Sequence, residues 1–259
     1  MTWHRQIHSK EWRWVILASL VVLTASSIPY LVAWSRETPE QAFSGCILLV
    51  EDCYSYLAKM RQGADGAWLF HISYTPEEHP GALFFLFHIL LGKTASLLPG
   101  GDLNRKLILV YQLARVIFGF SLLLTVYRFL AALTRRLAIR RLAWLMIALG
   151  GGLGWLLAGV GKARWLGNPP LDLYLAEGFA FIALYGFPHV AAAQSLLLGG
   201  FLCLLHAWGL AYGTVKRISD STDGQRTPET ADHIPLSPSL RWAILTGLVW
   251  LTMGLIIPF

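Results

Sequence analysis

Two adjacent carboxylates, Glu51 and Asp52, directly follow an apolar run from Phe43 to Val50. The run places both acids close to a boundary between hydrocarbon and water, where a charged group is costly unless it has a task. A carboxylate in such a place can accept the proton of an incoming hydroxyl group and act as a general base. We therefore predict that Asp52, with Glu51 beside it, is catalytic.

The residues after Val50 have the spacing of an amphipathic helix. Asp52, Tyr56 and Lys59 fall on one face at positions i, i+4 and i+7. The neighbouring face is apolar and consists of Cys53, Leu57 and Met60. This pattern predicts a short helix lying on a membrane surface. Aspartate is also a favoured helix N-cap and is stabilised by the helix dipole, so a structural role of Asp52 is the alternative.

The composition indicates an integral membrane protein. Of the 259 residues, 55% are hydrophobic and only 14% are charged, whereas soluble domains carry about 25% charged residues. Eleven Trp and nine Tyr residues suit the aromatic belts of a membrane interface. The net charge of +6 comes from Lys and Arg beside apolar runs. We therefore expect membrane lipids, and not nucleic acid, as partners.

We predict five membrane crossings, at residues 14–34, 106–131, 142–160, 189–212 and 241–258. Arg5, Lys10 and Arg13 precede the first run and predict a cytoplasmic N-terminus in the cell (plasma or inner) membrane. With this orientation, the arginine cluster around Arg135 to Arg141 lies on the cytoplasmic side only if the apolar run 81–98 does not cross the membrane. That run carries His88 and Lys93, so we predict that it stays on the outer side.

The predicted fold class is all-α: a polytopic transmembrane helical bundle with amphipathic juxtamembrane helices in a large first outer loop. The chain divides into the N-terminus and first span (1–34), this outer loop (35–105), and the remaining bundle (106–259). The segment 215–239 is rich in Ser, Thr, Asp and Pro and is expected to be a cytoplasmic linker. Because the last apolar run continues to the final residue, we expect a partial chain or a partner chain that supplies further helices.

Three more polar residues are candidates for a site on the outer side. His79 precedes Pro80 at the start of an aromatic stretch, and His189 follows Pro188 at the end of a span. Arg115 lies within a span near its outer end. A buried arginine normally has an anionic partner, so Arg115 either pairs with a substrate phosphate or carboxylate or extends to the lipid headgroups.

Other conspicuous residues carry weaker expectations. Cys46 and Cys53 lie in the outer loop, where a disulfide is chemically allowed, but their spacing does not show that the thiols meet. The run from Gly150 to Gly154 lacks the Lys-Ser/Thr of a phosphate-binding loop and predicts close helix packing. The outer-side histidines have no i, i+4 pair, so no protein metal site is predicted.

The order of these features resembles the N-terminal half of the GT-C class glycosyltransferases, in particular the protein O-mannosyltransferase and aminoarabinose transferase relatives. The shared features are a first span, an acidic pair in the outer loop, a His-Pro opening an aromatic helix, and a span with an arginine followed by a basic turn. The similarity covers about residues 10–200. The relatives have many more spans than this chain.

The resemblance implies inverting transfer of a sugar from a polyprenyl-phosphate donor at the outer membrane face. It assigns Asp52 and Glu51 to the catalytic acidic position, His79 to the His-Pro position, and Arg115 to the arginine of the following span. The leaving phosphate is already anionic and needs a cation, which Arg115, Lys59 or a divalent metal ion would supply.

Tyr56, Lys59 and His189 complete the predicted substrate-binding residues. The alternative function is a non-catalytic membrane subunit, or a degenerate enzyme, that binds lipid or a protein partner.

Overall fold

The computed structural model describes residues 7–152, 154–162, 178–208 and 239–257, with the single positions 164, 167, 168, 170, 172 and 175. The named elements in these ranges are all α-helices. In chain order they are α1 (Ser9–Ser35), α2 (Val50–Ala64), α3 (Leu86–Ser96), α4 (Leu103–Leu133), α5 (Leu137–Ala148), α6 (Gly154–Gly159), α7 (Ala180–Gly186), α8 (Pro188–Ala207) and α9 (Leu240–Ile256). The predicted all-α class is confirmed for this part of the chain, whereas most of the predicted linker 215–239 lies outside the described residues.

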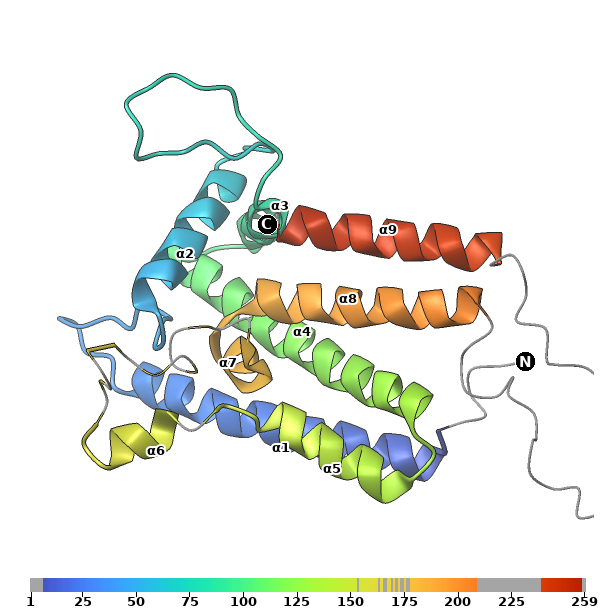
Figure 1. Ribbon diagram of the computed structural model, residues 1–259. Helices are drawn as coiled ribbons and strands as arrows, with labels where there is room; N and C mark the ends of the chain where they lie inside the picture. Colours follow the sequence, from blue (N-terminus) through green and yellow to red (C-terminus); the bar gives the residue numbers. More distant parts are fainter. Residues whose placement is uncertain are drawn as a thin grey trace, which may run out of the picture.

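Three helices are long and apolar enough to cross a membrane: α1 with 27 residues, α4 with 31 and α8 with 20. At 1.5 Å per residue, helices of about 20 residues or more match a hydrocarbon core of about 30 Å. They correspond to the predicted runs 14–34, 106–131 and 189–212, although the last four residues of the third run lie outside the described residues. The chain is therefore a membrane protein. Helix α9 is apolar but has only 17 residues, and it packs along α8 (Figure 1).

The predicted crossing at 142–160 is not a continuous helix. Helix α5 has 12 residues and ends at Ala148, and α6 begins only at Gly154. Between them Gly152 adopts φ +70°, a left-handed conformation that glycine tolerates and that interrupts a helix. Helix α5 alone is about 18 Å long, which is too short for a crossing.

Two of the glycines at this break, Gly152 and Gly154, make room for a carboxylate and not, as predicted, for a neighbouring helix. The backbone N–H of Gly154 donates to Oδ2 of the buried Asp172 at 2.6 Å. A Cβ atom added to Gly152 or Gly154 would collide with the Asp172 carboxyl group. Glycine at positions 152 and 154 is therefore explained by a close approach of Asp172 to the backbone.

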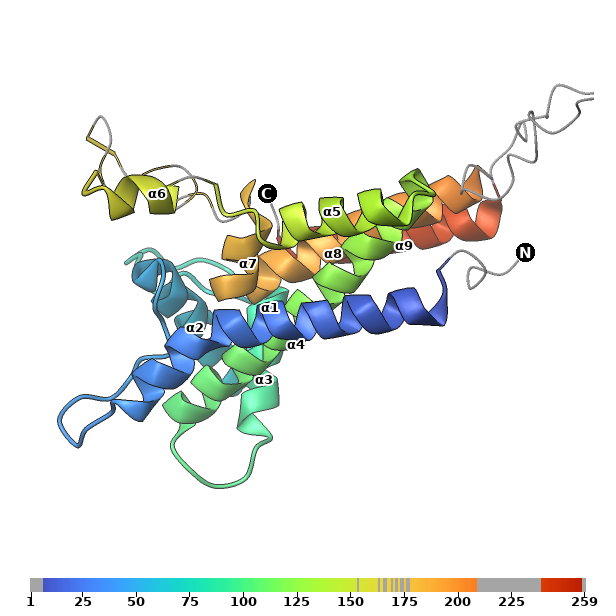
Figure 2. The same ribbon diagram turned by 90° about the horizontal axis from the view of Figure 1, so that it is seen from below.

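Helices α2 and α3 lie across one end of the bundle, which we call the α2–α3 end. Helix α3 is seen end-on in Figure 1 and upright in Figure 2, so it runs roughly perpendicular to α9. Its 11 residues are too few to cross a membrane, which agrees with the prediction that 81–98 does not cross; its place on the outer side stays a prediction. The ends of α1 and α9 and the beginnings of α4 and α8 lie at the same end (Figures 1 and 2).

Two glycines allow α2 and α3 to pack against each other with their backbones in contact. The position of a Cβ on Gly63 is occupied by the Ile89 carbonyl, and that of a Cβ on Gly92 by the Met60 carbonyl. Met60 and Ile89 are fully buried beside these contacts. The two short helices therefore form one unit.

A buried ion pair joins α1 and α5 at the opposite end of the bundle. The Arg140 guanidinium lies 3.3 Å from the Glu11 carboxylate, and both side chains are largely buried. The indole N–H of Trp144 donates to the Leu123 carbonyl of α4 at 2.9 Å. Helix α5 thus contacts both α1 and α4, although its 12 residues are too few to span a membrane.

We expect Gly92→Ala to destabilise the protein and Gly199→Ala to leave it unchanged or slightly more stable. A methyl group at Gly92 meets the Met60 carbonyl, whereas nothing lies within 4 Å of the Cβ position at Gly199. Overpacking costs about 1–3 kcal/mol, and alanine is about 0.8–1.0 kcal/mol better than glycine in a helix. Thermal unfolding in detergent measures both variants, and equal unfolding midpoints would contradict the close α2–α3 contact.

Candidate functional site

Three rings from three helices meet at the α2–α3 end of the bundle. The Tyr56 ring of α2 lies 4.7 Å from the His88 ring of α3 and 4.5 Å from the His189 ring of α8, measured between ring centres. The two imidazoles are 4.9 Å apart. We call Tyr56, His88 and His189 the three-ring cluster. Sequence analysis selected Tyr56 and His189 as site residues but not His88.

The two imidazoles are buried without hydrogen bonds that would satisfy them. His88 is 0% exposed and His189 is 7% exposed. Both ring nitrogens of His88 and Nδ1 of His189 lack a hydrogen-bond partner among the described residues. Leaving a buried polar atom unsatisfied costs about 1–3 kcal/mol. Burial, together with nearby His189 and Lys59, holds the pKa of His88 well below its usual value, so its imidazole is neutral at pH 7.

Lys59 lies beside the cluster on the same helix as Tyr56. Its ammonium group donates to Ser55 Oγ at 2.7 Å and sits 4.0 Å from the centre of the Phe85 ring and 4.9 Å from that of Tyr56. Burial lowers the pKa of Lys59, while the Asp52 carboxylate raises it. Asp52 itself is exposed. Helix α2 therefore carries Asp52, Tyr56 and Lys59 on one face, as predicted, with Cys53 and Met60 buried on the neighbouring face.

The N-cap of α2 is Leu49 and not Asp52. Leu49 adopts φ 46° and makes no side-chain cap, so the proposed capping role of Asp52 is wrong. Asp52 lies in the first helical turn, where the helix dipole still favours a negative charge. Phe85, the N-cap of α3, is also left-handed, with φ 54°.

These two N-caps are the only non-glycine residues with positive φ in the part of the chain that the structure describes. Such a conformation costs about 1–3 kcal/mol and is typical of functional sites. Both residues adjoin the three-ring cluster: Leu49 packs in the same apolar group as Tyr56, and the Phe85 ring lies 6.3 Å from that of His88. The two strained backbone positions are therefore the N-termini of α2 and α3, next to the three-ring cluster.

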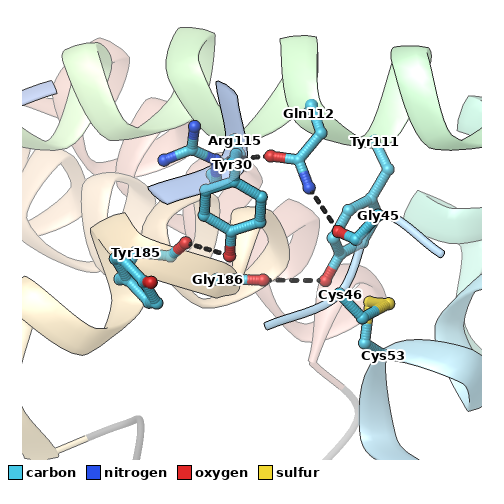
Figure 3. The surroundings of a disulfide bond; sticks show 9 residues. All are labelled: Tyr30, Gly45, Cys46, Cys53, Tyr111, Gln112, Arg115, Tyr185 and Gly186. Carbon is cyan, nitrogen blue, oxygen red and sulfur yellow. Dashed lines mark hydrogen bonds between the residues drawn. A yellow bond between two sulfur atoms is a disulfide. The ribbon is translucent and has the colours of Figure 1, made fainter. Parts of the chain in front are cut away.

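A disulfide holds the segment that leads into α2. Cys46 and Cys53 are bonded, with their Cα atoms 6.1 Å apart. The Gln112 side chain of α4 donates to the carbonyl of Gly45 at 2.8 Å (Figure 3). The loop before Asp52 is thus tied both to α2 and to α4. Sequence spacing had left this disulfide undecided.

The same face of α4 also holds the entry to α8. The Tyr111 hydroxyl donates to the carbonyl of Gly186 at 2.9 Å, and the Tyr30 hydroxyl of α1 donates to the carbonyl of Tyr185 at 2.6 Å (Figure 3). Gly186 stands three residues before His189. These bonds therefore fix the position from which His189 enters the cluster.

Arg115 is buried in this scaffold, 2% exposed, with its guanidinium 4.5 Å from the centre of the Tyr30 ring. Its hydrogen-bond acceptors are Gln112 Oε1 at 2.7 Å, Ser27 Oγ at 2.8 Å, Leu184 O at 3.2 Å and Ser26 Oγ at 3.3 Å. All are neutral, and no ion pair to Arg115 occurs among the described residues. Arg115 joins α1, α4 and α7, and its contact with a substrate phosphate stays a prediction.

The remaining predicted site residues lie outside the three-ring cluster. His79 is half-buried in the loop between α2 and α3, where its ring nitrogens lie 3.2 Å from the Pro80 carbonyl and 3.3 Å from the Ile72 carbonyl. Its ring is 5.9 Å from that of His71. Glu51 is exposed at the start of α2. The sequence did contain a signal for His88. It is a titratable residue inside an apolar stretch, where most residues that become buried are apolar.

An apolar pocket of about 570 Å³ lies farther along the bundle, between α4, α5 and α8. Its walls include Leu122 and Val126 of α4, Met146 of α5 and Leu197 of α8. No group of three or more His, Cys, Asp or Glu side chains suited to a metal occurs within the described residues.

No family model, curated protein or solved structure matches this chain.

We expect Arg115→Met to lower the unfolding midpoint strongly, because the substitution leaves several buried acceptors without a donor, each costing about 1–3 kcal/mol. Arg105→Met is the matched control on the same helix: Arg105 is exposed and pairs with Glu37 at 3.3 Å, and surface pairs contribute about 0–1 kcal/mol. Thermal unfolding in detergent gives both values. A small loss in Arg115→Met, equal to that of the control, would contradict the structural role.

Proposed function

We propose that this protein is a membrane transferase that moves a sugar from a polyprenyl-phosphate donor to a hydroxyl acceptor at the outer face of the cell membrane. One observation carries the proposal. The Asp52 carboxylate and the Lys59 ammonium lie on one face of α2, beside a buried cluster of polar rings, at the end of a membrane bundle. A base and a cation are the two groups that the reaction requires.

The proposed chemistry assigns one task to each group. Asp52 accepts the acceptor's hydroxyl proton as the oxygen attacks the anomeric carbon. The bond between that carbon and the phosphate oxygen breaks, and the phosphate leaves with the electron pair. The ammonium of Lys59 stabilises the leaving phosphate. Tyr56 and His189 bind the sugar through their polar atoms and ring faces, and the lipid chain remains in the membrane.

Two further features support the location and the lipid-linked donor. A disulfide at Cys46 and Cys53 is typical of an oxidising compartment outside the cytoplasm, whereas Arg136, Arg140 and Arg141 cluster where α5 begins, at the opposite end of the bundle (Figure 1). The apolar pocket among the long helices suits part of an isoprenoid chain.

The second candidate is a non-catalytic subunit that binds lipid or a partner protein. It is favoured by the exposure of Asp52 and Glu51, because a catalytic carboxylate is more often enclosed with its substrate. The two proposals predict different rates of sugar transfer when Asp52 is replaced by a residue that cannot accept a proton.

We expect Asp52→Asn to reduce sugar transfer about 10²–10⁴-fold, the usual loss when a positioned base is removed. The amide preserves the shape of the side chain, and because Leu49 is the N-cap, capping is unaffected. Asp65→Asn is the matched control, since Asp65 is an exposed acid at the other end of α2. Transfer is measured with labelled polyprenyl-phosphate sugars in membranes. Equal transfer by both variants would contradict the catalytic role of Asp52 and favour the non-catalytic proposal.

The proposed orientation is tested by cysteine labelling in a Cys203→Ser background, since Cys203 is the only free cysteine. We expect a membrane-impermeant maleimide to label Ala58→Cys on α2 from outside intact cells. Ala138→Cys on α5, which is exposed at the opposite end, should react only after the cells are permeabilised. The reverse pattern would invert the topology and place the site in the cytoplasm.

A further inference from the structure

The apolar pocket between α4, α5 and α8 opens at the surface of the bundle. Helices α5 and α8 both pack on α4, whose Leu122, Val126 and Leu133 line the pocket. Met146 of α5 and Leu197 of α8 line it as well, and these two side chains are 68% and 38% exposed. Because α4 and α8 are long enough to span a membrane, this surface faces hydrocarbon. The volume of about 570 Å³ is typical of a site for a small molecule.

A pair of arginines stands at the end of the pocket where Leu133 lies. Leu133 is the last residue of α4, and Arg135 follows two residues later, so their Cα atoms are at most about 8 Å apart. On α5, steps of three or four residues back from Ile147 place Ile139 and the N-cap residue Arg136 on the face that lines the pocket. Both arginines are exposed. The apolar pocket is thus continued by two positive charges at one end.

No acidic residue of the lining helices offsets these charges. The sequence has no Asp or Glu in 103–171, which contains α4 and α5, or in 178–208, which contains α7 and α8. Glu11 of α1 is close to this end, but its carboxylate pairs with the buried Arg140 at 3.3 Å. The end of the pocket is therefore suited to an anion.

We propose that the pocket holds an acyl chain of one anionic phospholipid, and that Arg135 and Arg136 bind its phosphate group. Apart from Gln194, the described side chains that line the pocket are apolar and match a hydrocarbon chain. Guanidinium groups bind phosphate oxygens through paired N–H donors. The lipid belongs to the leaflet at the end of the bundle where α5 begins, opposite the α2–α3 end (Figure 1).

The position of the charges distinguishes this lipid from the polyprenyl-phosphate donor. The donor phosphate is proposed to lie near Lys59, at the α2–α3 end, so a polyprenyl chain would enter the pocket from that end. A phosphate bound by the arginine pair instead requires a headgroup at the opposite end. The inference is therefore independent of sugar transfer, and its test measures lipid binding alone.

Native mass spectrometry of the full-length protein in detergent tests the headgroup contact. The protein is titrated with dioleoyl phosphatidylglycerol, which is anionic, and with dioleoyl phosphatidylcholine, which has the same chains and no net charge. We expect the first phosphatidylglycerol to bind at least about tenfold more tightly, because two arginines near a membrane surface attract an anionic headgroup. Equal affinity of wild type for the two lipids would overturn the proposal.

Two double variants assign the preference to the arginine pair. Arg135→Gln with Arg136→Gln should bind both lipids equally. Arg105→Gln with Lys106→Gln is the matched control, since these adjacent basic residues lie at the other end of α4, and it should keep the preference for phosphatidylglycerol. Retention of the preference in the first variant, or its loss only in the second, would refute the assignment.

A tryptophan in the pocket tests the acyl-chain contact. Leu197→Trp fills the pocket, whereas Leu245→Trp makes the same change on α9 at a side chain of similar exposure, 40% against 38%. We expect the affinity for phosphatidylglycerol to fall at least about tenfold in Leu197→Trp and to be unchanged in Leu245→Trp. Met146→Trp fills the pocket from α5 and should act as Leu197→Trp does. Monodisperse elution shows which variants fold, and unchanged affinity in a folded pocket variant would place the lipid elsewhere.

Two other results would assign the pocket to a different occupant and overturn the proposal. A polyprenyl phosphate that binds more tightly than phosphatidylglycerol, and is weakened by Leu197→Trp but not by the Arg135 and Arg136 substitutions, would identify a chain entering from the α2–α3 end. A dimer that Leu197→Trp disrupts, without any preference for the anionic lipid, would identify a second copy of this chain.

Discussion

The arrangement depends on a positive charge that the chain buries between membrane helices. A guanidinium in apolar surroundings is tolerated only when its N–H groups have acceptors. Arg115 finds them in two serines of α1, an amide one turn away on α4, and a carbonyl of α7. The requirement that these acceptors converge fixes the relative positions of three helices that apolar contacts alone would leave free to slide.

The polar face of α4 that carries Arg115 also positions the candidate site. Gln112, which accepts from Arg115, donates to the loop before α2, and Tyr111 donates to the turn before α8. Asp52 and His189 therefore depend on neighbouring residues of one helix, although they are far apart in the chain. The disulfide shortens the free segment before α2 further. A chain held at so many points can maintain the left-handed backbone at Leu49, which the surrounding contacts must compensate.

Burial increases in steps from the surface to the interior of the site. Asp52 is exposed, Lys59 and Tyr56 are half-buried, and His88 is completely enclosed. The charged groups Asp52 and Lys59 are thus closer to water, whereas the neutral imidazoles lie in a medium where dipole interactions are strong. This order suits a site that receives a polar headgroup from the membrane surface while the deepest residues stay in place.

The amino-acid sequence by itself determined the class of protein and the local geometry of α2. Apolar runs of sufficient length predict membrane helices from the thickness of the hydrocarbon core, and the 3.6-residue period places Asp52, Tyr56 and Lys59 on one face whatever the helix packs against. His88 and Lys93 also showed that 81–98 is a poor membrane span. These conclusions rest on interactions within a few residues of the chain.

Only the tertiary structure decided which distant residues meet. The contact between His88 and His189, the pairing of Cys46 with Cys53 and the acceptors of Arg115 depend on how helices cross, which no local period encodes. The break at Gly152 was missed for the same reason. The apolar content of 142–160 predicts one helix, but glycine is free to adopt the left-handed conformation, and the Asp172 carboxylate occupies the space that the break provides.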